Sequence, residues 1–421
     1  MDSLIFGMPA VIVLGGGLAF YMAWAIGAND VANAMGTSVG SGALTIRRAI
    51  LVAAVFELGG ALLVGGHVTD TIRKGILDPA AFEGAADLFA YGMLAALAAA
   101  GTWLVIASRL GWPVSTTHSI LGAIVGVGAV IGGTEAVNWG KVIQIVLSWI
   151  TSPLMGGALA YGIFEITRRT ILDQDDPVAR ARRIGPLFFF WVFFTLGLVT
   201  LFKGLKNLKM DFDLPQALAL SVLVGLLGAA IGWAFLRKAR FADREEGGSR
   251  FAGVERLFAI LQVLTACAVA FAHGSNDVAN SIGPLAAVVA VAKSGVIGGK
   301  APVELWMLGI GGLGIVVGLA TYGYRVMETV GRRITELTPS RGFAAELAAA
   351  TTIVLASRLG IPVSTTHILV GSVLGVGLAR GIGALDMRVV GKILLSWIAT
   401  LPTGAVLAIF FYYFFKGLLG P

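Results

Sequence analysis

Apolar residues dominate the chain in long runs, and short polar segments separate these runs. A helical run of about 20 apolar residues is long enough to cross the ~30 Å hydrocarbon core of a bilayer. The runs predict full membrane spans near 9–34, 47–66, 140–164, 186–203, 215–236, 256–283, 302–324 and 390–416. Two further regions, 88–133 and 343–379, each hold two apolar arms around a Gly-x-Pro break. This pattern indicates an all-α polytopic membrane protein.

Two sequence motifs occur once in each half of the chain, in the same order. The segment Asn-Asp-Val-Ala-Asn at 29–33 recurs at 276–280, and a segment that ends in Pro-Val-Ser-Thr-Thr-His at 108–118 recurs at 357–367. Such self-similarity indicates an internal repeat. We therefore divide the chain into a first repeat over 1–165, two linking transmembrane helices with cytoplasmic loops over 166–255, and a second repeat over 256–421.

The number of membrane crossings predicts that the second repeat is inverted. Between the first span and its repeat near residue 256 the chain crosses five times, if each Gly-x-Pro region counts as zero or two crossings. With both termini outside, twenty of the 31 Lys and Arg residues fall on the cytoplasmic side, as the positive-inside rule requires. We expect about 12 transmembrane helices in two inverted-topology repeats, with broken helices and re-entrant hairpins. This architecture is typical of secondary transporters, whose sites lie where the repeats meet.

The composition excludes other classes of protein. Only 13% of the residues are charged, against about 25% in soluble domains, and this excludes a soluble enzyme. The net charge of +7 comes from loops between apolar spans, so it serves topology and not nucleic-acid binding. One cysteine allows no internal disulfide, and the first residues lack the basic segment of a cleaved signal peptide. No zinc or iron site is expected, because metal-ligand spacing is missing among the histidines, His67, His118, His273 and His367.

Four carboxylates lie inside predicted apolar spans: Asp30, Asp277, Glu57 and Glu304. An Asp at such a place costs roughly 2.5–3.5 kcal/mol on insertion scales, so these groups should face partners or water. The motifs around Asp30 and Asp277 combine oxygen ligands with poor helix formers, which predicts local unwinding around a hard cation such as sodium. The expected sodium ligands are Asn29, Asp30, Asn276 and Asp277, with Glu57 and Glu304 as further ligands or coupling groups. The alternative is hydrogen bonding that only joins helices.

Each Gly-x-Pro break leads into three hydroxyl side chains at the start of an apolar helix. Pro suits a first helical turn, hydroxyls suit caps, and the open N–H groups at the positive helix end attract an anion. In an inverted repeat two such tips meet near the midplane and form a pocket for a tetrahedral oxyanion. Its predicted ligands are Ser115, Thr116, Thr117, Ser364, Thr365, Thr366, Asn33 and Asn280. The alternative is a simple helix cap, and His118 and His367 are expected to be structural donors near the tips.

Charge accounting predicts a mechanism. Buried carboxylates repel an anion in the same region, and neither the Asn-Asp nor the Ser-Thr-Thr segments contain Lys or Arg. Cations must therefore enter with the anion, which is symport. Ser115, His118 and Asp30 could also be interpreted as a nucleophile, its base and an orienting acid. We disfavour that interpretation because the acid lies on another element and both copies are alike.

The two Gly-x-Asn-Asp-Val-Ala-Asn segments and the two Pro-Val-Ser-Thr-Thr-His segments resemble the signature of the inorganic phosphate transporter (PiT) family. The resemblance covers nearly the whole chain, in order and in both halves. It implies inverted repeats, termini outside, and sodium- or proton-driven phosphate uptake. It also implies transport roles for the carboxylates at Asp30, Asp277, Glu57 and Glu304, and it suggests a homodimer.

The resulting hypothesis is a secondary active transporter of the inner cell membrane, with both termini outside, that carries inorganic phosphate into the cell. It would work by sodium symport through alternating access, with no enzymatic activity, no cofactor and no nucleic-acid partner. Its expected partners are phosphate, sodium and the lipid bilayer. The alternatives are a proton-coupled metal-phosphate or sulfate symporter, an anion channel, and a membrane-embedded hydrolase. Paired carboxylates beside the pore argue against a channel.

Overall fold

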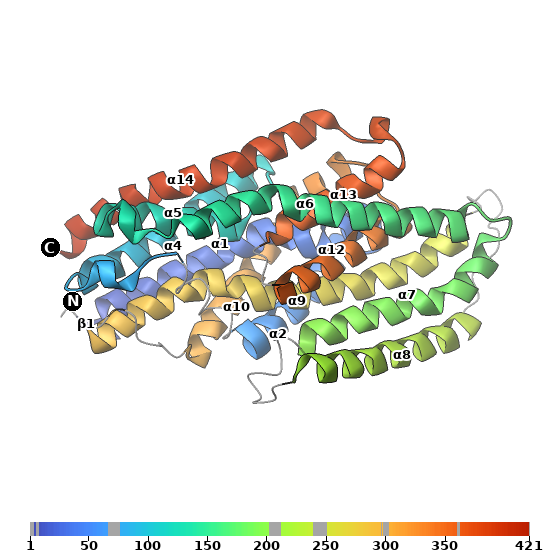
Figure 1. The fold of residues 1–421 in the computed structure, drawn as a ribbon, viewed down its shortest axis with the longest axis horizontal. Helices are drawn as coiled ribbons and strands as arrows, with labels where there is room; N and C mark the ends of the chain where they lie inside the picture. Colours follow the sequence, from blue (N-terminus) through green and yellow to red (C-terminus); the bar gives the residue numbers. More distant parts are fainter. Residues whose placement is uncertain are drawn as a thin grey trace.

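The computed structural model describes residues 4–5, 8–65, 76–201, 212–238, 251–295, 297, 303–359 and 363–420. Secondary structure in these residues is helical, apart from a short antiparallel pair, β1 (Leu4–Ile5) and β2 (Met8–Pro9). Most of the long helices run along one common direction, and the two chain ends lie at the same end of the molecule (Figure 1). The all-α polytopic fold predicted from the apolar runs is confirmed.

The helix bounds follow the predicted spans and arms closely. The first half contains α1 (Ala10–Gly40), α2 (Ile46–Val64), η2 (Pro79–Phe82), α4 (Ala86–Leu110), α5 (Thr116–Gly132) and α6 (Trp139–Thr167). The linking part contains α7 (Pro177–Val199) and α8 (Leu214–Lys238). The second half contains α9 (Ala252–Ser294), α10 (Leu305–Tyr322), α11 (Tyr324–Glu328), η7 (Thr329–Arg333), α12 (Pro339–Leu359), α13 (Thr365–Ala379) and α14 (Met387–Leu419). Eight helices of the described residues are long and apolar enough to cross a membrane: α1, α4, α6, α7, α8, α9, α10 and α14.

Glycines let α1 pack closely against the second half of the chain. A Cβ atom at Gly27 would overlap the backbone of Ile315, and one at Gly40 would overlap the backbone of Gly331. These contacts occur in the same order along both segments, so α1 runs parallel to α10 and to the η7 turn further along the chain. Close backbone approach at small residues is the usual way in which membrane helices associate.

The same relation holds between α2 and α9. A Cβ atom at Gly60 would overlap the backbone of Phe271, and one at Gly65 would overlap the side chain of Val278. The two helices are therefore parallel as well. Because α2 turns back on α1 through the short connection 41–45, α9 runs opposite to α1. The two halves are thus inverted relative to each other, as the count of crossings predicts.

The first Gly-x-Pro region is a helical hairpin, α4–α5. Gly111 ends α4 in the left-handed region, with φ of 69°, where residues with a side chain are disfavoured. The two outer ends of the hairpin lie together, because the backbone N–H of Asn138, after α5, donates to the backbone carbonyl of Ile76, before α4 (2.8 Å). With 17 residues, α5 is shorter than the roughly 20 residues of a full span.

The second region, α12–α13, is arranged in the same way. Its outer ends meet where the Arg380 side chain donates to the Glu336 carbonyl (3.0 Å). The two hairpin tips meet inside the molecule, since the Thr366 hydroxyl donates to the Val114 carbonyl (3.3 Å). These contacts favour re-entrant hairpins over paired full spans. The break residues 360–362 lie outside the described residues, as does His67.

The predicted unwinding around the two Asn-Asp motifs is wrong. Both α1 and α9 are continuous helices through Asp30 and Asp277. The poor helix formers are tolerated because Gly27 and Gly274 lie where two backbones touch, and tertiary packing outweighs intrinsic helix propensity. Any ion bound here must therefore be held mainly by side chains.

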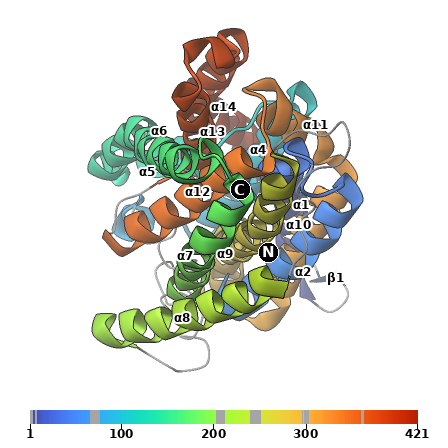
Figure 2. The same ribbon diagram turned by 90° about the vertical axis from the view of Figure 1, so that its right-hand side faces the viewer.

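The linking helices α7 and α8 pack side by side at one flank of the molecule (Figure 2). Gly228 and Gly232 of α8 lie against the rings of Phe193 and Phe189 of α7. Large apolar side chains such as Leu227 on the other side of α8 are exposed, which suits a lipid-facing surface. On its inner side α7 contacts α12 of the second hairpin, where the Trp191 indole donates to the Thr351 hydroxyl (3.2 Å).

Candidate ion and anion site

Each repeat contributes an asparagine to the hairpin tip of the other repeat. Asn33 of α1 donates to the Thr366 hydroxyl of the second hairpin (2.8 Å). Asn280 of α9 donates to the hydroxyls of Thr116 and Thr117 of the first hairpin (3.3 Å each). The two motifs of each repeat, far apart in sequence, are therefore brought to one buried place. This juxtaposition is the one predicted for an oxyanion pocket, although binding itself stays a prediction.

The serine of each tip caps its helix. Ser115 accepts a hydrogen bond from the His118 amide, and Ser364 accepts one from the His367 amide (3.2 Å each). The cap satisfies one open N–H group at each helix start and leaves the positive helix end directed at the tip. Thr365 lies beside a small internal cavity that Asn33 also lines. The predicted anion ligands thus gather at two helix N-termini.

Asn29 holds the first hairpin tip in place. Its side-chain amide donates to the Ser108 hydroxyl (3.1 Å) and to the Trp112 carbonyl (3.0 Å), and its oxygen accepts from the Val114 amide (3.1 Å). The amide is therefore engaged on both of its ends. Asn276, the repeat counterpart, donates instead to the Asp277 carboxylate (2.8 Å).

Three buried carboxylates surround the His273 ring. Its Nε2 atom lies 2.9 Å from an Asp277 oxygen and 3.6 Å from an Asp30 oxygen. Its Nδ1 atom lies 3.3 Å from a Glu57 oxygen. Several of these carboxylate oxygens have no hydrogen bond that meets standard geometry, and all four residues are at most 2% exposed. Buried carboxylate oxygens that lack hydrogen-bond partners are suitable ligands for a cation.

Sequence reasoning missed His273 as part of this cluster. Asp30, His273 and Asp277 form the group of the described residues whose ligand atoms lie close enough to share a metal ion. The signal was present, because His273 precedes Asp277 by four residues and such residues share one face of a helix. The expectation about the histidines considered only their spacing from one another and left out the aspartate four residues after His273.

Glu304 lies elsewhere, and its predicted place inside an apolar span is wrong. It is the N-cap residue of α10, its side chain is 39% exposed, and it forms an ion pair with Lys293 (2.8 Å). The hydrogen bonds from Lys293 and then Trp306 lower the pKa of Glu304 below its usual value. These contacts describe a surface carboxylate and not a member of the buried cluster.

The reason for this error is a difference in loop length between the repeats. The connection 295–304 before α10 is longer than the connection 41–45 before α2, so equal sequence offsets do not mark equal positions. Packing gives the true counterpart: Gly274 lies against the Glu57 backbone, and the equivalent Gly27 lies against the Ile315 backbone. Glu57 therefore corresponds to Ile315.

A fourth buried carboxylate, Glu346 of α12, was also missed. It accepts hydrogen bonds from Ser38 (2.7 Å), Thr265 (2.6 Å), Gln262 (3.4 Å) and Thr37. These donors come from α1 and α9, so Glu346 ties the second hairpin to both long helices. It is the only acidic residue of the sequence region 343–379, and an acid in an apolar arm is a signal of function or of buried pairing.

The two tip histidines contact each other. The His118 and His367 rings meet edge to face with centroids 4.9 Å apart, and the His367 ring stacks on Trp397 at 3.7 Å. The predicted role as structural donors is not supported for His367, because neither of its ring nitrogens has a hydrogen-bond partner among the described residues. Aromatic packing holds the two tips together instead.

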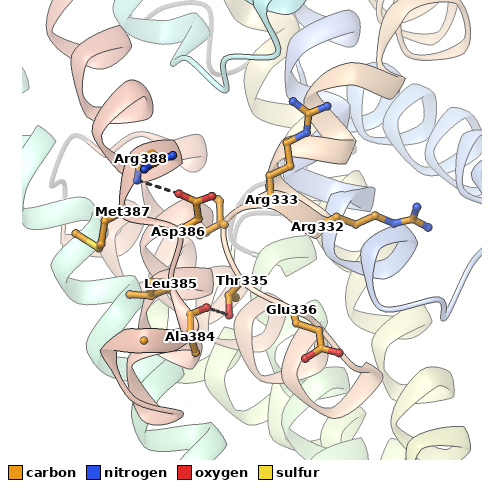
Figure 3. Close-up of a pocket in the computed structure, with 11 residues that line it drawn as sticks. Arg332, Arg333, Thr335, Glu336, Ala384, Leu385, Asp386, Met387 and Arg388 are labelled. Atoms are coloured by element: carbon orange, nitrogen blue, oxygen red, sulfur yellow. Dashed lines mark hydrogen bonds between the residues drawn. The ribbon is translucent and has the colours of Figure 1, made fainter.

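A surface concavity lies far from this cluster, between the η7 turn and the start of α14 (Figure 3). The side chains of Arg332 and Arg333 point away from Asp386 and in different directions. Because these cationic groups do not converge, we assign no ligand to this concavity. The buried cluster between the two hairpin tips remains the candidate site.

The geometry agrees with comparisons with known proteins. The model of the phosphate transporter family matches residues 26–408, which include both pairs of motifs. The chain belongs to the phosphate transporter family. The chain is 48% identical over 396 residues to one relative, a candidate phosphate permease of Haemophilus influenzae, and the match covers 94% of each chain. It is 44% identical over 425 residues to the chloroplastic inorganic phosphate transporter 2-1 of Arabidopsis thaliana, covering 95% of this chain and 71% of that protein.

A solved structure of a sodium-dependent phosphate transporter is also similar to this family member. The two share 40% sequence identity with a TM-score of 0.86, covering 97% of this chain and 99% of the other. At this identity and coverage the two proteins share the fold. The resemblance to the inorganic phosphate transporter family that the motifs predicted is therefore confirmed.

Proposed function

We propose that this transporter carries inorganic phosphate across the membrane together with sodium ions, by alternating access between its two sides. The observation that carries this proposal is the convergence of both hairpin tips and three buried carboxylates at the interface of the inverted halves. The family match and the likeness to a sodium-dependent phosphate transporter support phosphate and sodium as the pair of substrates. The sulfate and proton-driven alternatives have no specific contact in their favour.

Phosphate would bind where the asparagine–hydroxyl bonds now join the repeats. Asn33, Asn280 and the threonine hydroxyls of both tips supply donors, and the two helix N-termini supply oriented N–H groups. The proposed ligands are Ser115, Thr116, Thr117, Ser364, Thr365, Thr366, Asn33 and Asn280. A bound oxyanion would replace the bonds between asparagine and hydroxyl, so its binding would change how the two tips meet.

Sodium would bind at the carboxylates beside the tips. Asp30 and Asp277 are the proposed ligands, with Glu57 next to them and Asn276 in contact with Asp277. Among the described residues no lysine or arginine is buried, so only the His273 ring lies beside these acids as a basic group, and it does not offset three acids together with a phosphate. At separations of about 4 Å even a moderate effective dielectric makes such repulsion several kcal/mol. Co-bound sodium removes this repulsion, which couples the two substrates.

The inverted hairpins suit alternating access. One hairpin returns to one side of the molecule and the other hairpin to the opposite side, while both tips share the site. Movement of either hairpin would open the site to its own side. The excess of cations in the loops supports both termini outside in the inner cell membrane. The homodimer suggested by the family resemblance stays a prediction.

The hydrolase alternative finds little support. The Ser115 hydroxyl accepts from the His118 backbone amide, and the histidine near Asp30 is His273, not His118. Ser115, His118 and Asp30 therefore do not form the series of contacts that a nucleophile, its base and an orienting acid require. We propose that the chain has no enzymatic activity.

The decisive experiment is uptake of radiolabelled phosphate by proteoliposomes of the purified protein. A sodium gradient at fixed pH should drive accumulation, whereas a pH gradient without sodium should not, and excess sulfate should not compete. Asp30→Asn and Asp277→Asn should each lose most of the sodium-driven uptake, while Glu304→Gln serves as the matched surface control. Accumulation driven by the pH gradient alone, or full sodium dependence in both Asn variants, would refute the proposal.

A further inference from the structure

The two inverted repeats differ at the position just before the equivalent glycines Gly27 and Gly274. The residue before Gly274 is His273, and the residue before the equivalent Gly27 is Ile26. The opposing helix differs in the same way, because Glu57 corresponds to Ile315. Both isoleucines are fully buried. One repeat interface thus holds an imidazole and a carboxylate where the other holds two aliphatic side chains.

His273 connects three helices through their carboxylates. Its Nδ1 atom faces Glu57 of α2 at 3.3 Å, and its Nε2 atom faces Asp277 of its own helix at 2.9 Å and Asp30 of α1 at 3.6 Å. These oxygens include the proposed sodium ligands. The imidazole therefore approaches the same carboxylate lone pairs that a bound sodium ion would use.

We propose that His273 is a positioning residue that competes with sodium for these carboxylates. Without sodium, its ring nitrogens lie within ion-pair distance of Asp277, Asp30 and Glu57, and these contacts stabilise a site that three acids alone would repel apart. When sodium binds to Asp277 and Asp30, these contacts with His273 must lengthen or break. The imidazole therefore sets the sodium affinity of this half of the site, and the half with Ile26 and Ile315 has no equivalent control.

This inference rests on the proposed sodium binding and predicts an effect that a purely structural histidine would not have. Loss of the competing donor in His273→Leu should lower the protein's thermal stability in sodium-free choline buffer. It should also lower the apparent dissociation constant for sodium, by about tenfold, the lower range for losing a hydrogen bond to a charged group. His273→Gln keeps an amide NH2 group as a donor and should restore part of the wild-type behaviour.

The experiment titrates sodium against thermal unfolding of the purified full chain in detergent, without phosphate, with choline to hold the ionic strength constant. Ile26→Leu is the matched control at the equivalent position and should leave the sodium dependence unchanged. If His273→Leu binds sodium with equal or weaker affinity than the wild type, the competition is refuted while the sodium site stands. If the wild type shows no stabilisation by sodium at all, the proposed sodium coupling fails and this inference fails with it.

Should His273→Leu not yield folded protein, His273→Gln decides alone. An affinity for sodium that is higher than in the wild type then supports the competition. An affinity that is unchanged or lower refutes it.

Discussion

Asn33 and Thr366 lie 333 residues apart in the chain, and the Asn33 amide donates a hydrogen bond of 2.8 Å to the Thr366 hydroxyl. Asn280 contacts Thr117 of the other hairpin in the corresponding way, at 3.3 Å. Each repeat therefore completes the tip of the other. The predicted anion site belongs to neither half alone, and this makes it sensitive to single changes on the long helices α1 and α9.

Replacement of either asparagine should weaken phosphate binding. Asn33→Ala or Asn280→Ala removes a buried amide whose loss typically costs about 1–3 kcal/mol, which corresponds to a rise in the phosphate KM of roughly 5- to 150-fold. Initial rates of phosphate uptake by proteoliposomes at saturating sodium would measure this. Asn138→Ala, which removes an exposed helix cap, is the matched control and should leave KM near the wild-type value. An unchanged KM in both buried variants would place the anion elsewhere.

The two glutamates that share a sequence offset should behave differently. Glu57→Gln changes a fully buried carboxylate beside His273, and sodium-driven phosphate uptake should fall by about tenfold or more, since one charged partner of the cluster is lost. Glu304→Gln only removes an exposed ion pair with Lys293, a contact that contributes at most about 1 kcal/mol. Its uptake should stay near the wild-type level. Equal losses in the two variants would contradict the assignment of Glu57 to Ile315 as counterparts.

The architecture could be predicted from the sequence because the repeat leaves two strong signals. The Asn-Asp and Ser-Thr-Thr segments recur in order, and the apolar runs give the number of crossings, so the inverted halves and the meeting of Asn33 with Thr366 follow. The composition of the tips also indicates the chemistry, since hydroxyls after proline at a helix start favour an anion.

Details that depend on packing could not be read in this way. The longer connection before α10 shifts the register, so Glu304 aligns with Glu57 in sequence but not in space. His273 was overlooked because its spacing of four residues from Asp277 gains meaning only once Asp30 and Glu57, on other helices, are known to lie beside it. The predicted unwinding of α1 failed for a related reason: glycine at position 27 serves close contact with α10 and not a break in the helix.

Close backbone packing at Gly274 should be essential for both stability and transport. A Cβ atom there would overlap the backbone of Glu57, so Gly274→Ala must push α2 away from α9. Overpacking of this kind costs typically about 1–3 kcal/mol and would also displace the Glu57 carboxylate from His273. We expect a lower melting temperature and reduced sodium-driven uptake. Gly309→Ala on α10 meets no atom within 4 Å, so it should leave the melting temperature unchanged or raise it slightly.

The buried carboxylate of Glu346 should stabilise the contact between the second hairpin and the long helices. Glu346→Leu removes the acceptor of Ser38, Thr265 and Gln262 together, and these donors lie where water does not reach. Some of the hydroxyls can turn to a carbonyl of their own helix, so the expected loss is about 2–4 kcal/mol and not the full sum of separate bonds. Thermal unfolding in detergent measures it. Glu328→Leu, which removes a surface ion pair with Arg333, should change stability by less than about 1 kcal/mol, and equal effects of the two changes would show that Glu346 does not hold the hairpin.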